Sequence, residues 1–409
     1  MREAVGAPAP AGRPGRGRRP GARESILDAI RAAEPLSRVE LAKITGLTEA
    51  AVSMTVRRLL EEGLVVETGR TPTGGKPRTL LQLDPIARLA VGVHLDEDAT
   101  TYVLTGQTGG VIARLARPAS LGDDRDSILR ALAADIDTLL AGSGIDPARC
   151  LGVGIVWPGP HSGGTPADDT LPHLRGLRGE ELGRQLSETT GWPVLVENDA
   201  TAAAVGEYWV ARVGPDQTFA ALYMGGGIGA GIVVEGRAMR GGHASAGEFG
   251  HLCLEVFGPE CWCGSRGCLE ILAGPRTVVT AAREDRIAAA EAGLDPAQPS
   301  RTVTADFGAI ARAARAGAPH CRALLESSAR YVAAAAETVV NLLDIDLVVL
   351  TGPGFAAASA IYGPAIMRRL APADAKTWHR NVTVTVSLAA ATASATGAAA
   401  LVLQSHLRA

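Results

Sequence analysis

Three cysteines and one histidine have the spacing of a metal site. Cys261, Cys263 and Cys268 lie within eight residues in the pattern C-x-C-G-x-x-G-C, and His251 precedes Cys261 by ten residues. Three thiolates and one imidazole suit a tetrahedral Zn²⁺, and the glycines of the pattern let the backbone turn tightly around an ion. We therefore predict a structural zinc site at these four residues, with Cys253 ranked below them because the glycines flank the other cysteines. The alternative is a set of buried free thiols beside a chance histidine.

Two carboxylates bracket this cysteine motif. Glu248 lies three residues before His251, and Glu270 lies two residues after Cys268. Carboxylates on so rigid a segment can present their oxygens to a polyhydroxylated ligand at low entropic cost. Residues 247–270 are therefore predicted both to stabilise the fold through the bound metal and to form part of a binding site.

A third polar group lies upstream, at Glu197-Asn198-Asp199. It follows a short apolar strand at 194–196 and precedes an Ala-rich helix at 200–210. Carboxylates and amides recognise sugars because each can bond two adjacent hydroxyls. Asn198 and Asp199 are therefore candidate sugar ligands, and capping of the following helix is their alternative role.

The periodicity of the chain after residue 88 predicts the scaffold for these groups. Apolar strands alternate with amphipathic helices, and the pattern of a strand hairpin begins again at residue 219. Two lobes that each open with a hairpin indicate a duplicated α/β unit with a cleft between the copies. We predict a first lobe at 88–200 and a second lobe with the zinc site at 201–409, with the C-terminal helix able to return to the first lobe.

Charge is unevenly distributed along the 409 residues. Residues 1–80 contain 14 Lys and Arg against 9 Asp and Glu, a net charge of +5, whereas the remainder contains 26 against 34, a net charge of −8. A basic N-terminal part joined to an acidic body predicts different partners for the two, with nucleic acid as the partner of the basic part. Residues 1–22, rich in Pro, Gly and Arg without apolar periodicity, are predicted to be a disordered basic tail.

Residues 23–84 have the pattern of a winged helix-turn-helix domain. An apolar stripe at helical spacing ends at Pro35, Ser37 can cap a short second helix, and Thr48 can cap a longer third helix. Two strands around a Gly-rich turn at 71–77 then form the wing.

The third helix is the candidate recognition helix. The predicted DNA contacts are Ser53, Thr55, Arg57 and Arg58 on this helix, and Lys76 and Arg78 on the wing. In such domains the helix enters the major groove, while phosphate contacts set its position. The alternative is a small helical dimerisation module, in which a basic wing has no role.

With these elements in order, the chain resembles the ROK family of repressors, uncharacterised reading frames and sugar kinases. The residues that carry the resemblance are G-E-F-G-H at 247–251, C-x-C-G-x-x-G-C-L-E at 261–270 and E-N-D at 197–199, after a winged helix. The resemblance covers nearly the whole chain from about Arg23, and the cysteine motif is the part of it that is most specific to the family. It implies an α/β fold with two actin-like, ribonuclease H-like lobes of the sugar-kinase type.

The resemblance also implies roles for individual residues. It implies sugar-hydroxyl binding by Asn198, Asp199, Glu248, His251 and Glu270. In the kinases of the family the equivalent of Asp199 is also the general base, and the equivalent of His251 also ligates zinc.

Two segments depart from the phosphate-binding pattern of those kinases. Where the kinases have G-x-D-x-G-G-T, this chain has His94 in place of the aspartate and has Asp96 and Glu97 in place of both glycines. Carboxylates at these positions would repel a polyphosphate. In the second lobe, Gly226 replaces the threonine of G-T-G-x-G. We therefore predict that ATP binding is lost and that Asp199 serves only as a hydroxyl acceptor.

Together these patterns predict a sugar-responsive DNA-binding regulator, a repressor of carbohydrate metabolism or transport genes that binds its operator as a homodimer or homotetramer. Because the phosphate-binding segments are altered, we expect the protein to be enzymatically inactive. We expect it in the cytoplasm, because no apolar run approaches the roughly 18–20 residues that span a bilayer and the N-terminus lacks the apolar core of a signal peptide. The alternative function is an ATP-dependent sugar kinase with an added DNA-binding domain, in which Asp199 is catalytic. A third possibility is a constitutive repressor whose sugar site is vestigial.

Overall fold

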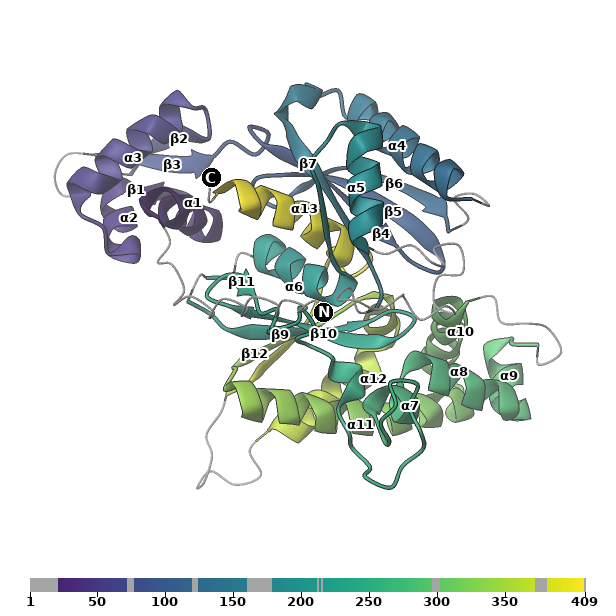
Figure 1. The fold of residues 1–409 in the computed structure, drawn as a ribbon. Helices are drawn as coiled ribbons and strands as arrows, with labels where there is room; N and C mark the ends of the chain where they lie inside the picture. Colours follow the sequence, from purple (N-terminus) through teal and green to yellow (C-terminus); the bar gives the residue numbers. More distant parts are fainter. Residues whose placement is uncertain are drawn as a thin grey trace, which may run out of the picture.

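The computed structural model describes residues 21–71, 77–119, 124–159, 179–211, 213–214, 216–295, 302–371 and 381–407. Residues 1–20 of the predicted tail and Lys76 of the predicted wing lie outside the described residues. The chain forms three parts, which are an N-terminal domain and two α/β lobes (Figure 1).

The N-terminal domain is a winged helix-turn-helix, as the sequence predicts. Its elements are α1 (Ala22–Ala33), β1 (Leu36–Ser37), α2 (Arg38–Thr45), α3 (Glu49–Glu61), β2 (Val65–Thr71) and β3 (Arg78–Leu83), with sheet order β1-β3-β2. Ser37 caps α2 in a capping box with Glu40, and Thr48 accepts a hydrogen bond from Ala51 N at the start of α3. The apolar stripes of the three helices meet in one core with Leu81 and Leu83 of β3.

The first lobe is built on a five-stranded mixed sheet. Its elements are β4 (Leu89–Leu95), β5 (Ala99–Gly106), β6 (Val111–Pro118), α4 (Arg125–Gly142), a 3₁₀ turn (Pro147–Arg149), β7 (Cys150–Trp157), α5 (Gly179–Thr190) and β8 (Val194–Asn198). The order across the sheet is β6-β5-β4-β7-β8, with β4 antiparallel to β5 and parallel to β7.

The second lobe repeats this arrangement. Its strands are β9 (Phe219–Met224), β10 (Ile228–Val234), β11 (Arg237–Ala238), β12 (Leu347–Thr351) and β13 (Thr383–Val386), in the order β11-β10-β9-β12-β13. Its helices are η3 (Phe249–His251), α7 (Leu269–Ala273), α8 (Pro275–Glu284), α9 (Arg286–Ala292), α10 (Val303–Arg315), α11 (Pro319–Leu343) and α12 (Pro353–Leu370). Both sheets therefore place their strands in the order third, second, first, fourth, fifth, which supports a duplicated unit.

Two helices lie between the lobes. Helix α13 (Ala393–Leu407) packs on β4 and β7 of the first lobe, α6 (Asp199–Val210) packs on β9 and β10 of the second, and the two helices pack on each other (Figure 1). Their backbones approach closely, because a Cβ at Gly397 would lie 1.6 Å from Ala202 O and a Cβ at Gly206 would lie 2.5 Å from Ala393 O. Only glycine permits this approach.

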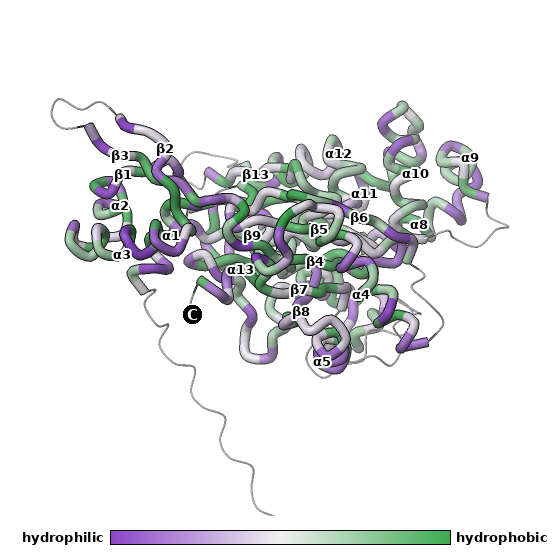
Figure 2. The backbone as a smooth tube through the Cα atoms, turned by 90° about the horizontal axis from the view of Figure 1, so that it is seen from above, coloured by the Kyte–Doolittle hydropathy of each residue, from purple (hydrophilic) through white to green (hydrophobic). Residues whose placement is uncertain are grey.

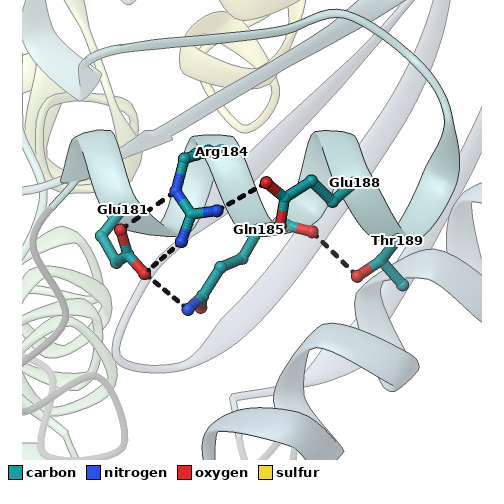
Figure 3. A network of polar contacts seen from close by, with 5 residues as sticks. All are labelled: Glu181, Arg184, Gln185, Glu188 and Thr189. Carbon is teal, nitrogen blue, oxygen red and sulfur yellow. Dashed lines mark hydrogen bonds and ion pairs between the residues drawn. The ribbon is translucent and has the colours of Figure 1, made fainter.

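Hydropathy follows these layers. Figure 2 shows hydrophobic segments gathered in the central strands and hydrophilic segments on outer helices such as α5. On α5, Arg184 forms ion pairs with Glu181 at 2.7 Å and with Glu188 at 2.5 Å (Figure 3). Ion pairs between exposed side chains contribute little to stability, so these pairs support the helix without deciding the fold. Among the described residues, every helix is too short or too polar to cross a bilayer.

We predict that Gly397→Ala destabilises the protein by about 1–3 kcal/mol, because the added methyl group forces α6 and α13 apart. Gly363→Ala is the matched control, since it is also a glycine inside a helix but its Cβ would meet no atom within 4 Å. Thermal unfolding followed by circular dichroism should give a lower Tm for Gly397→Ala alone. Equal melting temperatures of the two variants would contradict the close packing of these helices.

Candidate functional site

A cavity of about 370 Å³ lies where the start of α6, the glycine loop between β9 and β10, η3 and α7 meet. Its volume is in the range of small-molecule sites. The predicted sugar ligands all line it, namely Asn198, Asp199, Glu248, His251 and Glu270. Residues that are more than seventy positions apart in the sequence therefore share one cavity.

The start of α6 contributes an amide and a carboxylate to this cavity. Asn198 Oδ1 accepts a hydrogen bond from Thr201 N at 3.0 Å, and its Nδ2 donates to Gly159 O at 3.2 Å. Asp199 Oδ1 accepts from Ala200 N at 2.8 Å. The capping role that the sequence left open is thus present in the structure. It also fixes both side chains at the wall of the cavity.

Two glutamates also line the cavity. Glu270 Oε2 accepts a hydrogen bond from Ile228 N at 2.9 Å, which ties α7 to the glycine loop. Burial raises the pKa of Glu270 to about 7, although this hydrogen bond and the charge of Arg276 oppose the rise. Burial and then the charge of Asp199 raise the pKa of Glu248.

The cysteine motif forms a compact group beside the cavity. Cys261 Sγ lies 3.6 Å from His251 Nδ1, and Cys263 Sγ lies 3.7 Å from Cys268 Sγ. The ligand atoms of these four residues all lie within 4.8 Å of one another, so the group could hold a metal ion. Gly267 allows the tight turn, because its φ is +62° and a Cβ there would lie 1.6 Å from Glu255 O.

His251 joins the metal-ligand group to the cavity, since it belongs to both. The ring of Trp262 lies edge to face with the His251 ring, with 4.6 Å between centroids, and Trp262 is 64% exposed while it lines the cavity. Trp262 is not among the residues predicted from the sequence to line a site. Its position between two predicted ligand cysteines is the signal that could have found it. Tyr223 and Arg276 also line the cavity without a signal in the sequence.

The end of β4 and the turn after it carry the residues that depart from a phosphate loop. His94 is buried, and its Nε2 lies 3.8 Å from Asp199 Oδ2, which is an ionic contact too long for a hydrogen bond. Burial by itself would lower the pKa of His94, but Asp199 and Asp96 outweigh it and raise the pKa above its ordinary value. This contact places the ring of His94 beside the carboxylate that lines the cavity.

Glu97 reaches across to the second lobe. Its Oε1 accepts hydrogen bonds from Thr304 N at 2.9 Å and Thr304 Oγ1 at 3.2 Å. A Cβ at Gly226 would lie 3.2 Å from the same oxygen, so this carboxylate also lies against the glycine loop between β9 and β10. Burial raises the pKa of Glu97, although the hydrogen bond from Thr304 opposes the rise.

The predicted DNA-contacting residues lie in the winged helix domain. Ser53, Arg57 and Arg58 are exposed on α3, whereas Thr55 is half-buried. Arg78 is exposed at the start of β3, and Lys76 lies outside the described residues. Met54, 53% exposed, adds an apolar group to the same helix.

Fold and site together define a two-lobed body of the sugar-kinase type joined to a winged helix domain. Family comparison agrees with both parts, because residues 91–405 match the model of the ROK family and residues 25–76 match that of the MarR family. The chain belongs to the ROK family, and the predicted family and fold are confirmed.

Among its relatives is a xylose repressor of Caldicellulosiruptor bescii, which is 29% identical over 323 residues that cover 77% of this chain and 78% of the relative. A solved ROK family transcriptional regulator, described as a homologue of the Escherichia coli MLC protein, superposes with a TM-score of 0.68, 24% identity and coverage of 95% and 98%. A ROK family glucokinase of Streptomyces griseus, solved with glucose and AMPPNP, superposes with a TM-score of 0.61, 26% identity and coverage of 76% and 98%. The family thus includes repressors and kinases.

We predict that Cys263→Ala removes bound metal and destabilises the second lobe, because a metal held by thiolates stabilises only the folded state. Cys253→Ala is the matched control, since Cys253 is an exposed cysteine of the same segment outside the four-residue group. Elemental analysis of the purified proteins should find one metal per chain in the wild type and the control only. Undiminished metal in Cys263→Ala would exclude its role as a ligand.

Proposed function

We propose that the protein is a sugar-responsive transcriptional repressor that acts in the cytoplasm on genes of carbohydrate metabolism or transport. The observation that carries this proposal is that one chain joins a winged helix domain, with exposed polar residues on α3, to a cavity lined by an amide and three carboxylates. The winged helix domains of a homodimer or homotetramer bind operator DNA, and a sugar in the cavity changes their affinity for it. The names of relatives that are repressors support this proposal.

The cavity is the effector site in this proposal. Asn198, Asp199 and Glu248 form hydrogen bonds with adjacent sugar hydroxyls. His251 and Glu270, which line the same cavity, complete the set. An amide and three carboxylates in one cavity of about 370 Å³ suit a monosaccharide or a derivative of one.

Zinc is the metal that the four-residue group suits best. Around a tetrahedral zinc with bonds of about 2.3 Å to sulfur and 2.0–2.1 Å to nitrogen, two sulfurs lie about 3.8 Å apart and a sulfur and a nitrogen about 3.6 Å apart. The distances of 3.7 Å between Cys263 and Cys268 and of 3.6 Å between Cys261 and His251 support this ion. A zinc ion there would be structural and would fix the ring of His251 at the wall of the cavity.

We infer that the first lobe no longer binds the phosphates of ATP. Asp96 and Glu97 place carboxylates on the turn after β4. Glu97 accepts a hydrogen bond from Thr304 and lies against Gly226 in the glycine loop between β9 and β10. A polyphosphate between the two loops would meet negative charge in a partly buried place. Without a phosphoryl donor, Asp199 acts as a hydroxyl acceptor.

We predict that Arg57→Ala weakens operator binding uniformly and lowers the salt dependence of the affinity, because an exposed arginine on the recognition helix contributes phosphate or base contacts. Arg114→Ala is the control, since it removes the same charge from an exposed position on β6, outside the DNA-binding domain. An operator selected from random DNA provides the probe for shift assays at physiological salt. An unchanged affinity in Arg57→Ala would show that α3 is not the recognition helix.

We predict that a sugar from a panel including D-xylose, D-glucose and amino sugars binds the cavity and changes the fluorescence of Trp262, with no release of ADP from ATP. At 100 times its Kd such a sugar should add about 2.7 kcal/mol of stability. Asp199→Asn should weaken binding at least tenfold, or by about 1.4 kcal/mol, whereas Asp137→Asn, an exposed aspartate of α4, should not.

Each alternative function has its own outcome in this experiment. Robust sugar-dependent ADP release in a coupled assay would favour the sugar kinase. The absence of any sugar-induced change in stability or fluorescence would favour a constitutive repressor with a vestigial site.

A further inference from the structure

We propose that helix α6 transmits occupancy of the cavity to the DNA-binding domain and that Arg31 of α1 is the positioning residue that couples the two. This inference rests on the proposed function. The first residues of α6 line the cavity, and its last residues lie against α1. Its 12 residues span about 18 Å. One helix therefore connects the effector site to the winged helix domain.

Arg31 binds the C-terminal end of α6. Only 2% of Arg31 is exposed, and its Nη1 donates to Tyr208 O at 2.9 Å while its Nη2 donates to Val213 O at 3.1 Å. The guanidinium carbon lies 4.0 Å from the centroid of the Tyr208 ring. The last carbonyl groups of a helix are partly unsatisfied and carry partial negative charge, so a cation is favourable there. Arg31 thus fixes the N-terminal domain to the end of α6.

Asp28 completes a closed set of bonds around this contact. Arg31 Nε donates to Asp28 Oδ1 at 2.8 Å, and Tyr208 Oη donates to Asp28 Oδ2 at 2.7 Å. Because the guanidinium is a rigid planar fork, its donors meet all these acceptors in only one placement of α1 on α6. A small shift of α6 would therefore break several bonds of a buried charge at once.

Helix α6 is packed so that its two ends move together. A Cβ at Gly231 of β10 would lie 2.5 Å from both Ala200 O and Ala204 Cβ, and α13 approaches the opposite side of α6 through Gly206 and Gly397. Such close packing resists local deformation. Sugar hydroxyls that recruit Asn198 and Asp199 compete with their bonds to the first turn of α6, and the resulting shift reaches Tyr208.

A second contact between the same two parts avoids α6 and provides a control. Arg237 Nη2 of β11 lies 3.1 Å from Glu24 Oε1 of α1, and both side chains are partly exposed. Arg31→Met and Arg237→Met each remove one arginine that joins α1 to the body. Only the first removes the guanidinium bonds to the end of α6, whereas the bond from Tyr208 Oη to Asp28 remains in both variants.

The experiment measures operator affinity at one salt concentration, with and without saturating D-xylose or D-glucose, together with the sugar Kd in the absence of DNA. The wild type should show a ratio of operator affinities within the usual allosteric range of about 5–150-fold. In Arg31→Met, sugar should change operator affinity by no more than about twofold. The sugar Kd of this variant should stay within about threefold of the wild-type value. Arg237→Met should keep the wild-type ratio.

Hydrogen exchange supplies a second readout. Sugar should change amide exchange in residues 22–33 of the wild type but not of Arg31→Met. If Arg31→Met fails to fold, Arg31→Lys is measured in its place, because lysine keeps the positive charge but lacks the planar guanidinium and its several donors. A wild-type ratio in a folded Arg31 variant would overturn the coupling role of Arg31 and leave the proposed function standing. A wild type whose operator affinity responds to neither sugar would instead count against the proposed function, and the coupling with it.

Discussion

The backbone contact between α6 and α13 is the constraint on which the body of this protein depends. Each helix covers the sheet of one lobe, and glycines at Gly206 and Gly397 let the two helix backbones touch. A side chain at either position would separate the lobes and widen the cavity that lies at the start of α6. The same contact sets where the far end of α6 meets the DNA-binding domain. The position of the cavity and the position of the winged helix domain therefore both depend on this packing interaction.

Electrostatics decides what the cleft between the lobes can do. In this chain a carboxylate, Glu97, receives the hydrogen bonds of Thr304 at the start of α10, and Thr302 Oγ1 bonds Asp98 beside it. The N-terminus of a helix attracts negative charge, so these carboxylates already satisfy groups that would suit a phosphate. They also join the first lobe to the start of α10 in the second.

The sequence predicts best what depends on local spacing. The cysteine motif, the caps at Ser37 and Thr48, and the repeated hairpins each lie within a short segment whose chemistry is self-contained, and the structure contains all of them. The contacts of Arg31 with Tyr208 and of Glu97 with Thr304 join residues 177 and 207 positions apart. No periodicity encodes such pairs, because they depend on how whole lobes pack. Trp262 was missed for a different reason, since its exposure beside the cavity follows from the folding of the cysteine loop.

Arg31 of α1, buried against the end of α6, determines the orientation of the winged helix domain more than it stabilises the protein. Removing a guanidinium from water is costly, and a well-packed apolar side chain often stabilises a protein as much as a buried ion pair does. The guanidinium instead fixes one relative orientation of α1 and α6, because its hydrogen bonds to Asp28, Tyr208 and Val213 can all form in only one geometry. A purely apolar contact would let the winged helix slide on the end of α6 with little change in free energy. An interface that has to convert a small displacement into a change of orientation is therefore better served by a buried, fully bonded charge.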